Sequence, residues 1–167
     1  MSNLVLPDAE KLLLDLTETM RPHVTAQTGL IGIVTGGAWL AERLHLELGL
    51  SVPVGTLDVS FYRDDYQDKG LKHTVAPSEI PFDVEGRDLI LIDDVLYTGR
   101  TIRAAMNELF DYGRPASIRL AALVDRGGRE LPIAAQFVGA VIDVPARLSI
   151  ALEREATGRL SLKLQPQ

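Results

Sequence analysis

The chain has 167 residues, of which 46% are apolar, and it carries a formal net charge of −6 at pH 7. That length fits one domain with a full hydrophobic core, and the composition points to neither disorder nor a fibrous repeat. The sequence contains no cysteine, which excludes a disulfide framework, a thiolate nucleophile and a cysteine-ligated metal site.

The charge and the lack of targeting signals limit the binding partners and the cellular location that we expect. An acidic balance argues against a nucleic-acid-binding face, although a local basic patch is compatible with it. Residues 1–6 lack the basic segment and long apolar run of a signal peptide, and no apolar run approaches the ~20 residues of a membrane helix. We therefore expect a soluble, cytoplasmic protein.

The first third of the chain reads as a helix followed by a strand–helix–strand unit. Apolar residues recur at helical spacing from Ala9 to Met20, and Pro22 ends this helix. Leu30–Val34 reads as a buried strand, broken by Thr35-Gly36-Gly37. A second helix follows and stops at Gly49, and residues 52–59 favour the next strand. This order predicts a right-handed βαβ crossover.

The stretch from Phe61 to Pro81 is polar, charged and weakly periodic. A long polar loop inside a compact domain is often a lid over a site. A solvated surface hairpin is the alternative, and on this stretch alone it is the favoured one.

The second half alternates further strands with one helix. Leu89–Ile92 is the most apolar strand signal, and the helix after it carries an apolar face from Ile102 to Phe110, with Gly113 as its stop. The remaining predicted strands are Ile118–Val124, Phe137–Ile142, Leu148–Leu152 and Leu160–Leu164.

This alternation predicts an α/β fold with a mainly parallel central sheet flanked by helices. Ligands bind such sheets at the carboxyl ends of the strands. Three loops follow predicted strands and are therefore expected at one site: Thr35 to Gly37, Asp93 to Thr101, and Asp125 to Arg129.

The segment from Leu89 to Thr101 carries the chemistry. A strand leads into the paired acids Asp93 and Asp94, then into a Thr/Gly turn and a helix start. A helix N-terminus presents unpaired N–H groups to a phosphate, and Gly99 lets the backbone approach it closely. Adjacent carboxylates accept hydrogen bonds from vicinal hydroxyls or hold Mg²⁺ through its waters. The combination predicts a ribose-phosphate site.

Other interpretations of this segment account for less. A helix cap explains one acid and not the whole arrangement. The sequence has no G-x-x-x-x-G-K-[ST] loop and no G-x-G-x-x-G fingerprint, which excludes a Walker A or dinucleotide site. The three histidines, His23, His45 and His73, have no ligand spacing and read as surface residues.

The run IDDVLYTGRT (Ile92–Thr101) resembles the ribose-phosphate loop of type I phosphoribosyltransferases. Its ending is similar to the PyrR family, pyrimidine-operon regulators that are also uracil phosphoribosyltransferases. Three more stretches share this resemblance, which covers about residues 30–152: Thr56 to Asp65, Gly113 to Gly127, and Arg129 to Ile133.

The resemblance implies roles for individual residues. Asp93 and Asp94 would hold the ribose hydroxyls, with Arg126 as a third catalytic residue. The turn around the 5′-phosphate would be formed by Val95, Leu96, Tyr97, Thr98, Gly99, Arg100 and Thr101. The other substrate-binding residues would be Thr35, Gly36 and Gly37 at the diphosphate, Tyr62 and Arg63 in a mobile flap, and Asp125, Arg126 and Ile150 near the base.

The resemblance also implies one phosphoribosyltransferase domain over residues 1–167. It would carry a flexible flap hairpin at about 61–81 and a small hood formed by the N-terminal segment and about 126–150. It implies a glycosyltransferase that converts uracil and 5-phosphoribosyl-1-diphosphate to UMP and diphosphate in pyrimidine salvage, with Mg²⁺. A homodimer or higher homo-oligomer is expected.

Tyr97 favours a pyrimidine base. In the purine branch of these enzymes an acid holds this position and manages a proton on the base. Tyrosine is a poor general base at neutral pH, and the ring N–H of uracil is acidic enough to need little help. A tyrosine that merely packs at the edge of the site is the alternative. For Asp125 and Arg126, a purely structural ion pair is an equal alternative to a base contact.

A UMP-dependent RNA-binding regulator of transcription attenuation is the competing function. Against it, the early helix carries only Lys11 before Arg21, and the loop reads Thr35-Gly36-Gly37 where attenuators have Thr-Arg-Gly. Residues usual in attenuators are replaced by Gly128, Ala140 and Val144. RNA binding is therefore disfavoured. A sensor of the donor that does not turn over is a third candidate.

Overall fold

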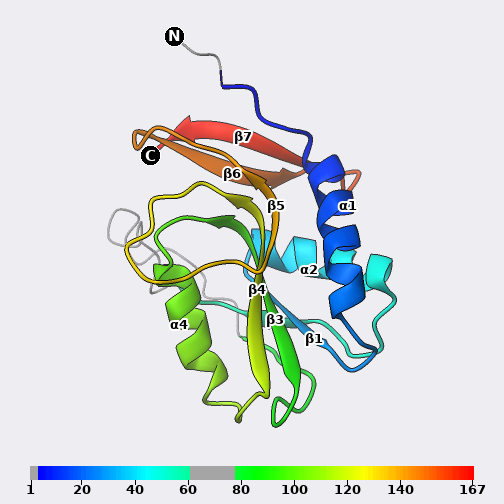
Figure 1. Cartoon of the computed structure of the whole chain (residues 1–167). Coiled ribbons are helices and arrows are strands. Elements are labelled where there is room, and N and C mark those ends of the chain that lie inside the picture. Colours follow the sequence, from blue (N-terminus) through cyan, green and yellow to red (C-terminus); the bar gives the residue numbers. More distant parts are fainter. Residues whose placement is uncertain (1–3, 61–77) are drawn as a thin grey trace.

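The computed structural model describes residues 4–60 and 78–167, and its centre is a parallel sheet of five strands in the order β2-β1-β3-β4-β5 (Figure 1). Every neighbouring pair in this sheet is parallel. The strands are β1 (Gly29–Ile33), β2 (Gly55–Leu57), β3 (Asp88–Leu96), β4 (Ser117–Asp125) and β5 (Phe137–Val141). The predicted α/β class is confirmed.

Helices cover both faces of the sheet and divide its core into two clusters. On one face, α1 (Ala9–Met20) and α2 (Gly36–Leu48) pack against Leu30, Ile90 and Leu123. On the other, α4 (Arg100–Leu109) packs against residues of the opposite parity in the same strands, such as Ile31, Leu91 and Ala122. The strands are therefore buried on both sides, which explains their continuous apolar runs.

The helix ends follow local chemistry. The Asp8 side chain caps α1 by accepting a hydrogen bond from the Glu10 N–H at 2.9 Å. After Met20 the chain makes a short 3-10 turn, η1 (Arg21–His23), which contains Pro22. Gly49 ends α2 with a left-handed φ of 63°, a conformation that a side chain disfavours. The predicted ends of both helices are confirmed.

Two details of the predicted elements were wrong. The strand expected over Val52–Val59 is only Gly55–Leu57. The helix expected to reach Gly113 ends at Leu109, and Phe110 is 59% exposed instead of lying on the buried face. Residues 61–77, which include most of the expected flap, lie outside the described residues.

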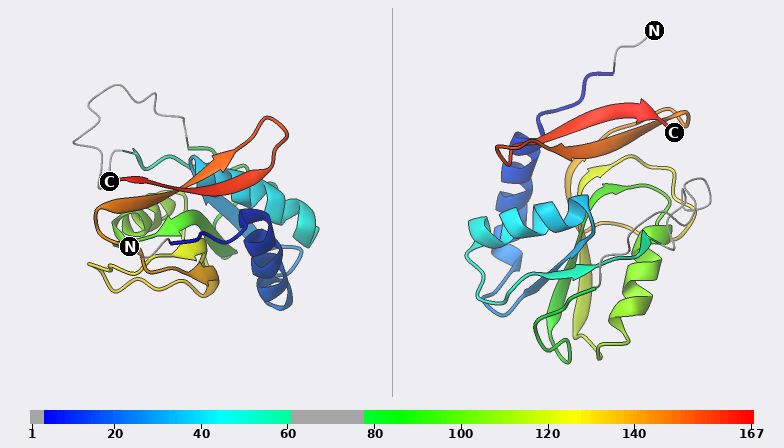
Figure 2. Two further views of the ribbon diagram at one scale, coloured as in Figure 1. Left: turned by 90° about the horizontal axis from the view of Figure 1, so that it is seen from above. Right: turned by 180° about the vertical axis from the view of Figure 1, so that it is seen from behind.

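A two-stranded antiparallel sheet follows the main sheet. Its strands are β6 (Leu148–Arg154) and β7 (Leu160–Pro166). Seen from above, this hairpin crosses over the end of the main sheet (Figure 2). It therefore lies on the side where the parallel strands terminate. Among the described residues, no helix is long and apolar enough to cross a bilayer.

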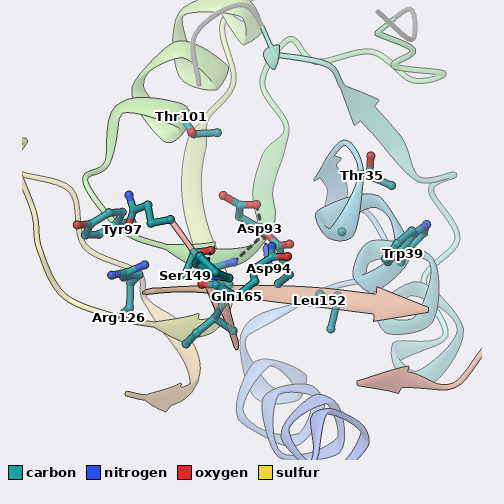
Figure 3. Close-up of a pocket in the computed structure, with 16 residues that line it drawn as sticks. Thr35, Trp39, Asp93, Asp94, Tyr97, Thr101, Arg126, Ser149, Leu152 and Gln165 are labelled. Carbon is teal, nitrogen blue, oxygen red and sulfur yellow. Dashed lines mark hydrogen bonds between the residues drawn. The ribbon is translucent and has the colours of Figure 1, made fainter. Parts of the chain in front are cut away.

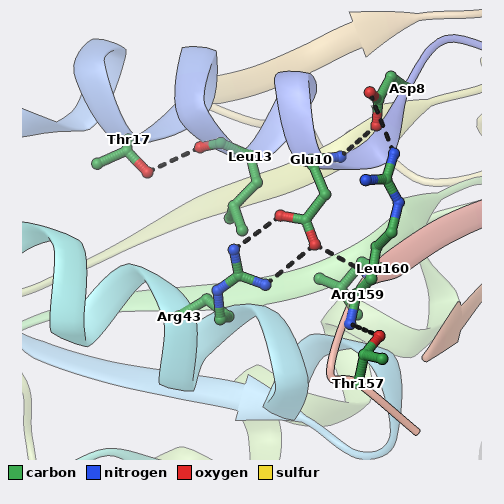
Figure 4. A network of polar contacts seen from close by, with 8 residues as sticks. All are labelled: Asp8, Glu10, Leu13, Thr17, Arg43, Thr157, Arg159 and Leu160. Carbon is green, nitrogen blue, oxygen red and sulfur yellow. Dashed lines mark hydrogen bonds and ion pairs between the residues drawn. The ribbon is translucent and has the colours of Figure 1, made fainter. Parts of the chain in front are cut away.

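A polar network joins the hairpin to the two helices of one face (Figure 4). The Arg43 guanidinium on α2 donates to both carboxylate oxygens of Glu10 on α1, at 3.1 and 2.7 Å. The Leu160 N–H at the start of β7 also donates to Glu10, at 2.9 Å. The Arg43 hydrogen bonds lower the pKa of Glu10, with the Leu160 N–H adding to them, and together they outweigh burial, which acts to raise it. One carboxylate therefore ties three elements together.

We predict that Glu10→Gln lowers the free energy of unfolding by about 1 kcal/mol at pH 7, because charge-assisted hydrogen bonds are replaced by neutral ones. The folded protein holds the pKa of Glu10 below its unfolded value. This contribution is therefore complete above the unfolded pKa and is lost as the pH falls through the folded pKa. Urea unfolding from pH 7 down to pH 3 measures it.

The matched control is Glu18→Gln, which removes an exposed ion pair with Arg21 from the same helix. Exposed pairs contribute little, so this variant stays close to wild type at every pH. Equal losses in the two variants, or a Glu10→Gln defect that does not shrink in acid, would contradict the role of the network.

Candidate functional site

Successive connections leave β1 and β3 toward opposite edges of the sheet. From β1 the chain passes through α2 to β2 on one side, and from β3 it passes through α4 to β4 on the other. Such a switch point opens a crevice at the carboxyl ends of the two central strands. The Thr35 loop follows β1 and the Asp93–Thr101 segment lies at the end of β3, so both predicted site loops meet here.

Glycines allow the first turn of α2 to press against β3. A Cβ atom at Gly37 would overlap the Ile92 carbonyl oxygen, and one at Gly36 would overlap Oδ2 of Asp94. On the β1 side, a Cβ atom at Gly32 would lie 2.6 Å from Cα of Ala38. The N-terminus of α2 therefore lies directly against the acidic pair. The Val34–Thr35 peptide bond at this point is cis.

The two acids are oriented by the backbone at the end of β3. Oδ1 of Asp93 accepts the Asp94 N–H at 2.9 Å, and Oδ1 of Asp94 accepts the Val95 N–H at 2.9 Å. Asp93 is only 4% exposed. Side chains held by their own backbone lose little freedom when a ligand binds, so the pair is a preorganised set of acceptors.

The turn after the acids ends in the start of α4. Gly99 has a left-handed φ of 93°, and the Arg100 N–H donates to the Thr98 hydroxyl at 3.2 Å. The first N–H groups of α4 have no partner within the helix and carry the positive end of its dipole. A second helix N-terminus therefore lies beside the acids, opposite that of α2.

Tyr97 and Arg126 form a stacked pair at the edge of this region. The Arg126 guanidinium carbon lies 3.9 Å from the centre of the Tyr97 ring. Arg126 is 6% exposed, and its Nε has no hydrogen-bond partner among the described residues. A buried donor without a partner costs about 1–3 kcal/mol.

These groups line one cavity of about 690 Å³ (Figure 3). The figure shows Asp93 and Asp94 between Thr101 on one side and Thr35 on the other, with Tyr97 and Arg126 next to each other. The volume lies within the usual range of about 300–1,000 Å³ for small-molecule sites. The wall opposite the acids comes from the β6–β7 hairpin.

The structure brings most of the predicted residues to this cavity. The predicted residues that line it are Thr35, Gly36, Asp93, Asp94, Val95, Tyr97, Thr101, Arg126 and Ile150. Those that do not line it are Gly37, Leu96, Thr98, Gly99, Arg100 and Asp125. Tyr62 and Arg63 lie outside the described residues. The functional roles of all these residues stay predictions.

Seven lining residues were not predicted: Trp39, Ser149, Ala151, Leu152, Gln165, Pro166 and Gln167. The position of Trp39 could have been predicted, since it follows Thr35 by one helical turn and therefore lies on the same face of α2. The other six lie on or beside the last hairpin, of which the family resemblance pointed only to Ile150.

Asp125 is held by the protein itself. Its carboxylate accepts the Gly127 N–H at 2.9 Å and forms an ion pair with Arg129 at 2.5 Å. Burial acts to raise the pKa of Asp125, but these two hydrogen bonds outweigh it and the pKa is lowered. Of the two predicted base-side residues, Arg126 lines the cavity and Asp125 supports the loop behind it.

Comparison with known proteins places this geometry in a family. The sequence model of the phosphoribosyl transferase domain matches residues 7–146. The chain belongs to the phosphoribosyltransferase family. Among its curated relatives, the Bifunctional protein PyrR of Pseudomonas putida (strain W619) is 50% identical over 97% of this chain and 94% of that protein. The Bifunctional protein PyrR of Pseudomonas aeruginosa (strain LESB58) is 51% identical over 83% of this chain and 84% of that protein.

These relatives make the chain a phosphoribosyltransferase of the PyrR family. Solved structures agree on the fold. A hypoxanthine-guanine phosphoribosyltransferase from Bacillus anthracis has a TM-score of 0.67, with 19% identity and coverage of 84% of this chain and 85% of that one. A hypoxanthine phosphoribosyl transferase of Trypanosoma cruzi has a TM-score of 0.66 at 21% identity, covering 87% of this chain and 80% of that one.

Trp39 is the only tryptophan in the sequence of this phosphoribosyltransferase, and it lines the cavity. The guanidinium carbon of Arg154 lies 4.7 Å from the centre of the Trp39 ring. We predict that a phosphoribosyl ligand bound in the cavity changes its fluorescence, because indole emission follows local polarity and nearby charge. Titration with 5-phosphoribosyl-1-diphosphate and Mg²⁺ measures the change. Unaltered emission at donor concentrations that calorimetry shows to saturate the protein would place the donor elsewhere.

Proposed function

We propose that this protein is a uracil phosphoribosyltransferase, which converts uracil and 5-phosphoribosyl-1-diphosphate to UMP and diphosphate in pyrimidine salvage. The observation that carries the proposal is the meeting of a backbone-oriented acidic pair and two helix N-termini in one cavity. Acids suit sugar hydroxyls and helix N-termini suit phosphates, and the donor contains both groups.

The donor would lie along the crevice of the switch point. Asp93 and Asp94 accept hydrogen bonds from the ribose hydroxyls. The turn Val95–Thr101 and the start of α4 receive the 5′-phosphate, with hydroxyl donors from its threonines. The Thr35–Gly37 segment at the start of α2 receives the diphosphate. This arrangement orients the ribose between two anion sites, so its anomeric carbon is fixed for attack.

The residues of this site would bind Mg²⁺ only together with oxygen ligands from the substrate. Asp93 and Asp94 are oxygen donors of the kind that Mg²⁺ prefers, but no group of three or more metal-ligating side chains exists among the residues at 4–60 and 78–167. Mg²⁺ is commonly held by one or two carboxylates together with substrate phosphates and water. Bound in this way, the ion supplies neutralisation of charge on the diphosphate leaving group.

The base would lie between the Tyr97–Arg126 pair and Ile150 on β6, which both line the cavity. Tyr97 is a poor general base at neutral pH, so the base itself must give up its ring proton readily, as uracil does. Arg126 lines the cavity, and its guanidinium would donate to a carbonyl oxygen of the base. Such a bond strengthens as charge builds up on the attacking ring, which makes Arg126 the proposed catalytic cation.

The remaining chemistry rests on charge and on water exclusion. As the diphosphate departs, positive charge develops on the ribose ring, by analogy with glycoside hydrolysis. The Asp93 and Asp94 carboxylates lie beside that charge and stabilise it. Closure of the expected flap at 61–81 and of the hood would exclude water that otherwise hydrolyses the donor. The hood would comprise the N-terminal segment and residues 126–150, as parts of one domain over 1–167.

We predict that Asp94→Asn lowers kcat/KM for uracil by about 100-fold or more, because a carboxylate that orients the ribose and faces its developing charge is lost. In the same assay Arg126→Lys lowers kcat for uracil about tenfold, since an ammonium cannot reproduce the stacked planar donor whose hydrogen bond strengthens in the transition state. Steady-state rates with radiolabelled uracil measure both effects.

The control is Asp88→Asn, which alters an exposed acid at the opposite end of the same strand, bonded to Ser117. Its rates should equal those of wild type. Orotate and hypoxanthine serve as competing bases. Use of either one in place of uracil by the wild-type protein would make the base assignment wrong.

RNA-dependent regulation is the second candidate, and the word "bifunctional" in the names of the relatives favours it. We predict no UMP-dependent binding of a structured pyrimidine-leader RNA, because the net charge is −6 and the early helix α1 carries one basic residue, Lys11. Filter binding at two salt concentrations measures it. Tight, salt-sensitive and UMP-dependent binding would reverse the order of the two functions.

A protein that senses the donor without turning it over is the third candidate. It would bind 5-phosphoribosyl-1-diphosphate and release no diphosphate.

We also expect the protein to lie in the cytoplasm, where the proposed substrates are found. A homodimer or higher homo-oligomer is the expected assembly, as the family resemblance implies.

A further inference from the structure

We propose that Arg129 is a positioning residue for the turn Val95–Thr101, which is the proposed site of the donor's 5′-phosphate. We also propose that Gly128 leaves the space in which the Tyr97 ring stacks on Arg126. This inference rests on the proposed function and assigns a task to a loop that does not itself form the cavity wall. The loop is Gly127–Ile133, which follows Arg126.

Arg129 holds the turn by its backbone. Its Nη1 donates to the Tyr97 carbonyl oxygen at 2.7 Å, and its Nε donates to the Ile133 carbonyl oxygen at 2.8 Å. Tyr97 lines the cavity, whereas Arg129 does not. A hydrogen bond from a charged donor to a backbone carbonyl fixes the peptide plane, and that plane sets where the following N–H groups of the turn point.

Arg129 is itself held in place. Its Nη2 pairs with Oδ2 of Asp125 at 2.5 Å, and the two side chains are only 24% and 18% exposed. The other carboxylate oxygen of Asp125 accepts the Gly127 N–H at 2.9 Å. The guanidinium is therefore locked between the end of β4 and the turn, and its geometry is that of a rigid fork rather than of a mobile surface arginine.

The loop Gly127–Ile133 also contacts the turn Val95–Thr101 at a second point. The Thr98 carbonyl oxygen accepts the N–H groups of Glu130 at 2.9 Å and of Leu131 at 3.2 Å. At Gly99, a Cβ atom would lie 3.0 Å from Cγ1 of Ile133. Successive residues of the turn are thus fixed by the loop through backbone bonds and close packing, before any ligand is present.

The ring of Tyr97 is confined from two sides. The Arg126 guanidinium stacks on it at 3.9 Å. A Cβ atom at Gly128 would lie 2.8 Å from Cδ1 of the ring and closer still to Cε1. Gly128 therefore permits a ring position that any other residue there would displace, and displacing the ring removes the surface on which Arg126 lies.

The matched comparison uses two adjacent glycines. Gly127 and Gly128 share a left-handed φ of 73°, so alanine imposes similar backbone strain at either one. A Cβ atom at Gly127 would meet nothing within 4 Å, whereas one at Gly128 meets Tyr97. The difference between Gly128→Ala and Gly127→Ala therefore reports the Tyr97 contact alone.

The experiment measures binding of 5-phosphoribosyl-1-diphosphate with Mg²⁺ by calorimetry, without any base. We expect Arg129→Lys and Arg129→Ala to raise the donor Kd about 10-fold or more, since small misplacements of anchoring groups are costly. Guanidinium chloride at low millimolar concentration should restore part of the affinity of Arg129→Ala and none of that of Arg129→Lys. Rescue by the missing group is an outcome that general loss of stability does not produce.

For the ring, KM for uracil should rise several-fold more in Gly128→Ala than in Gly127→Ala. Glu18→Gln is the control, because it removes only an exposed ion pair with Arg21 at the end of α1, and its donor Kd should equal that of wild type. If Arg129→Ala does not fold, Arg129→Lys and the glycine pair carry the test.

The outcomes separate this inference from the proposed function. Folded Arg129 variants with wild-type donor affinity would overturn the positioning role, as would equal effects of the two glycine substitutions for the ring. A wild-type protein that binds the donor but does not use uracil would overturn only the base assignment. A wild-type protein that binds no donor would overturn both proposals.

Discussion

The site depends on the close approach of α2 to β3 at the switch point of the sheet. Gly32, Gly36 and Gly37 have no side chains, so the first turn of the helix touches the Ile92 carbonyl and the Asp94 carboxylate. A larger residue at any of these places would push the N-terminus of α2 away from the acids. The spacing between the acidic pair and the N-terminus of α2 is therefore set by backbone packing.

The other walls of the cavity are attached to this centre by polar links. Glu10 connects the β6–β7 hairpin to α1 and α2. Arg129, which is held by Asp125, connects the loop after β4 to the turn after β3 through its hydrogen bond to the Tyr97 carbonyl oxygen. Each link joins segments that are distant in the sequence. The cavity is thus assembled from strand ends and a hairpin, with charged hydrogen bonds at the joints and apolar packing elsewhere.

The helices, the strands and the site at the carboxyl edge could be predicted because local patterns encode them. Alternating apolar runs, the Gly49 stop and the Asp93-Asp94 pair followed by a turn are readable in a single chain. Of the hairpin wall only Ile150 was predicted, and that from the family resemblance. The rest could not be predicted, because the placement of β6 and β7 depends on tertiary contacts such as Glu10 with Leu160. Phe110 was placed wrongly because an apolar residue at helical spacing need not be buried once the helix has ended at Leu109.

The charges that line the cavity have a consequence for what it admits. Two carboxylates, Asp93 and Asp94, face one guanidinium, Arg126, among the described lining residues. The cavity wall is therefore net negative, and a bare polyanion entering it meets repulsion that dipoles only partly offset. If the donor binds as proposed, the complex of donor and divalent ion should enter more readily than the bare donor. Occupancy would then follow the concentration of that complex rather than that of the total donor, and catalysis would depend on the free magnesium level of the cell.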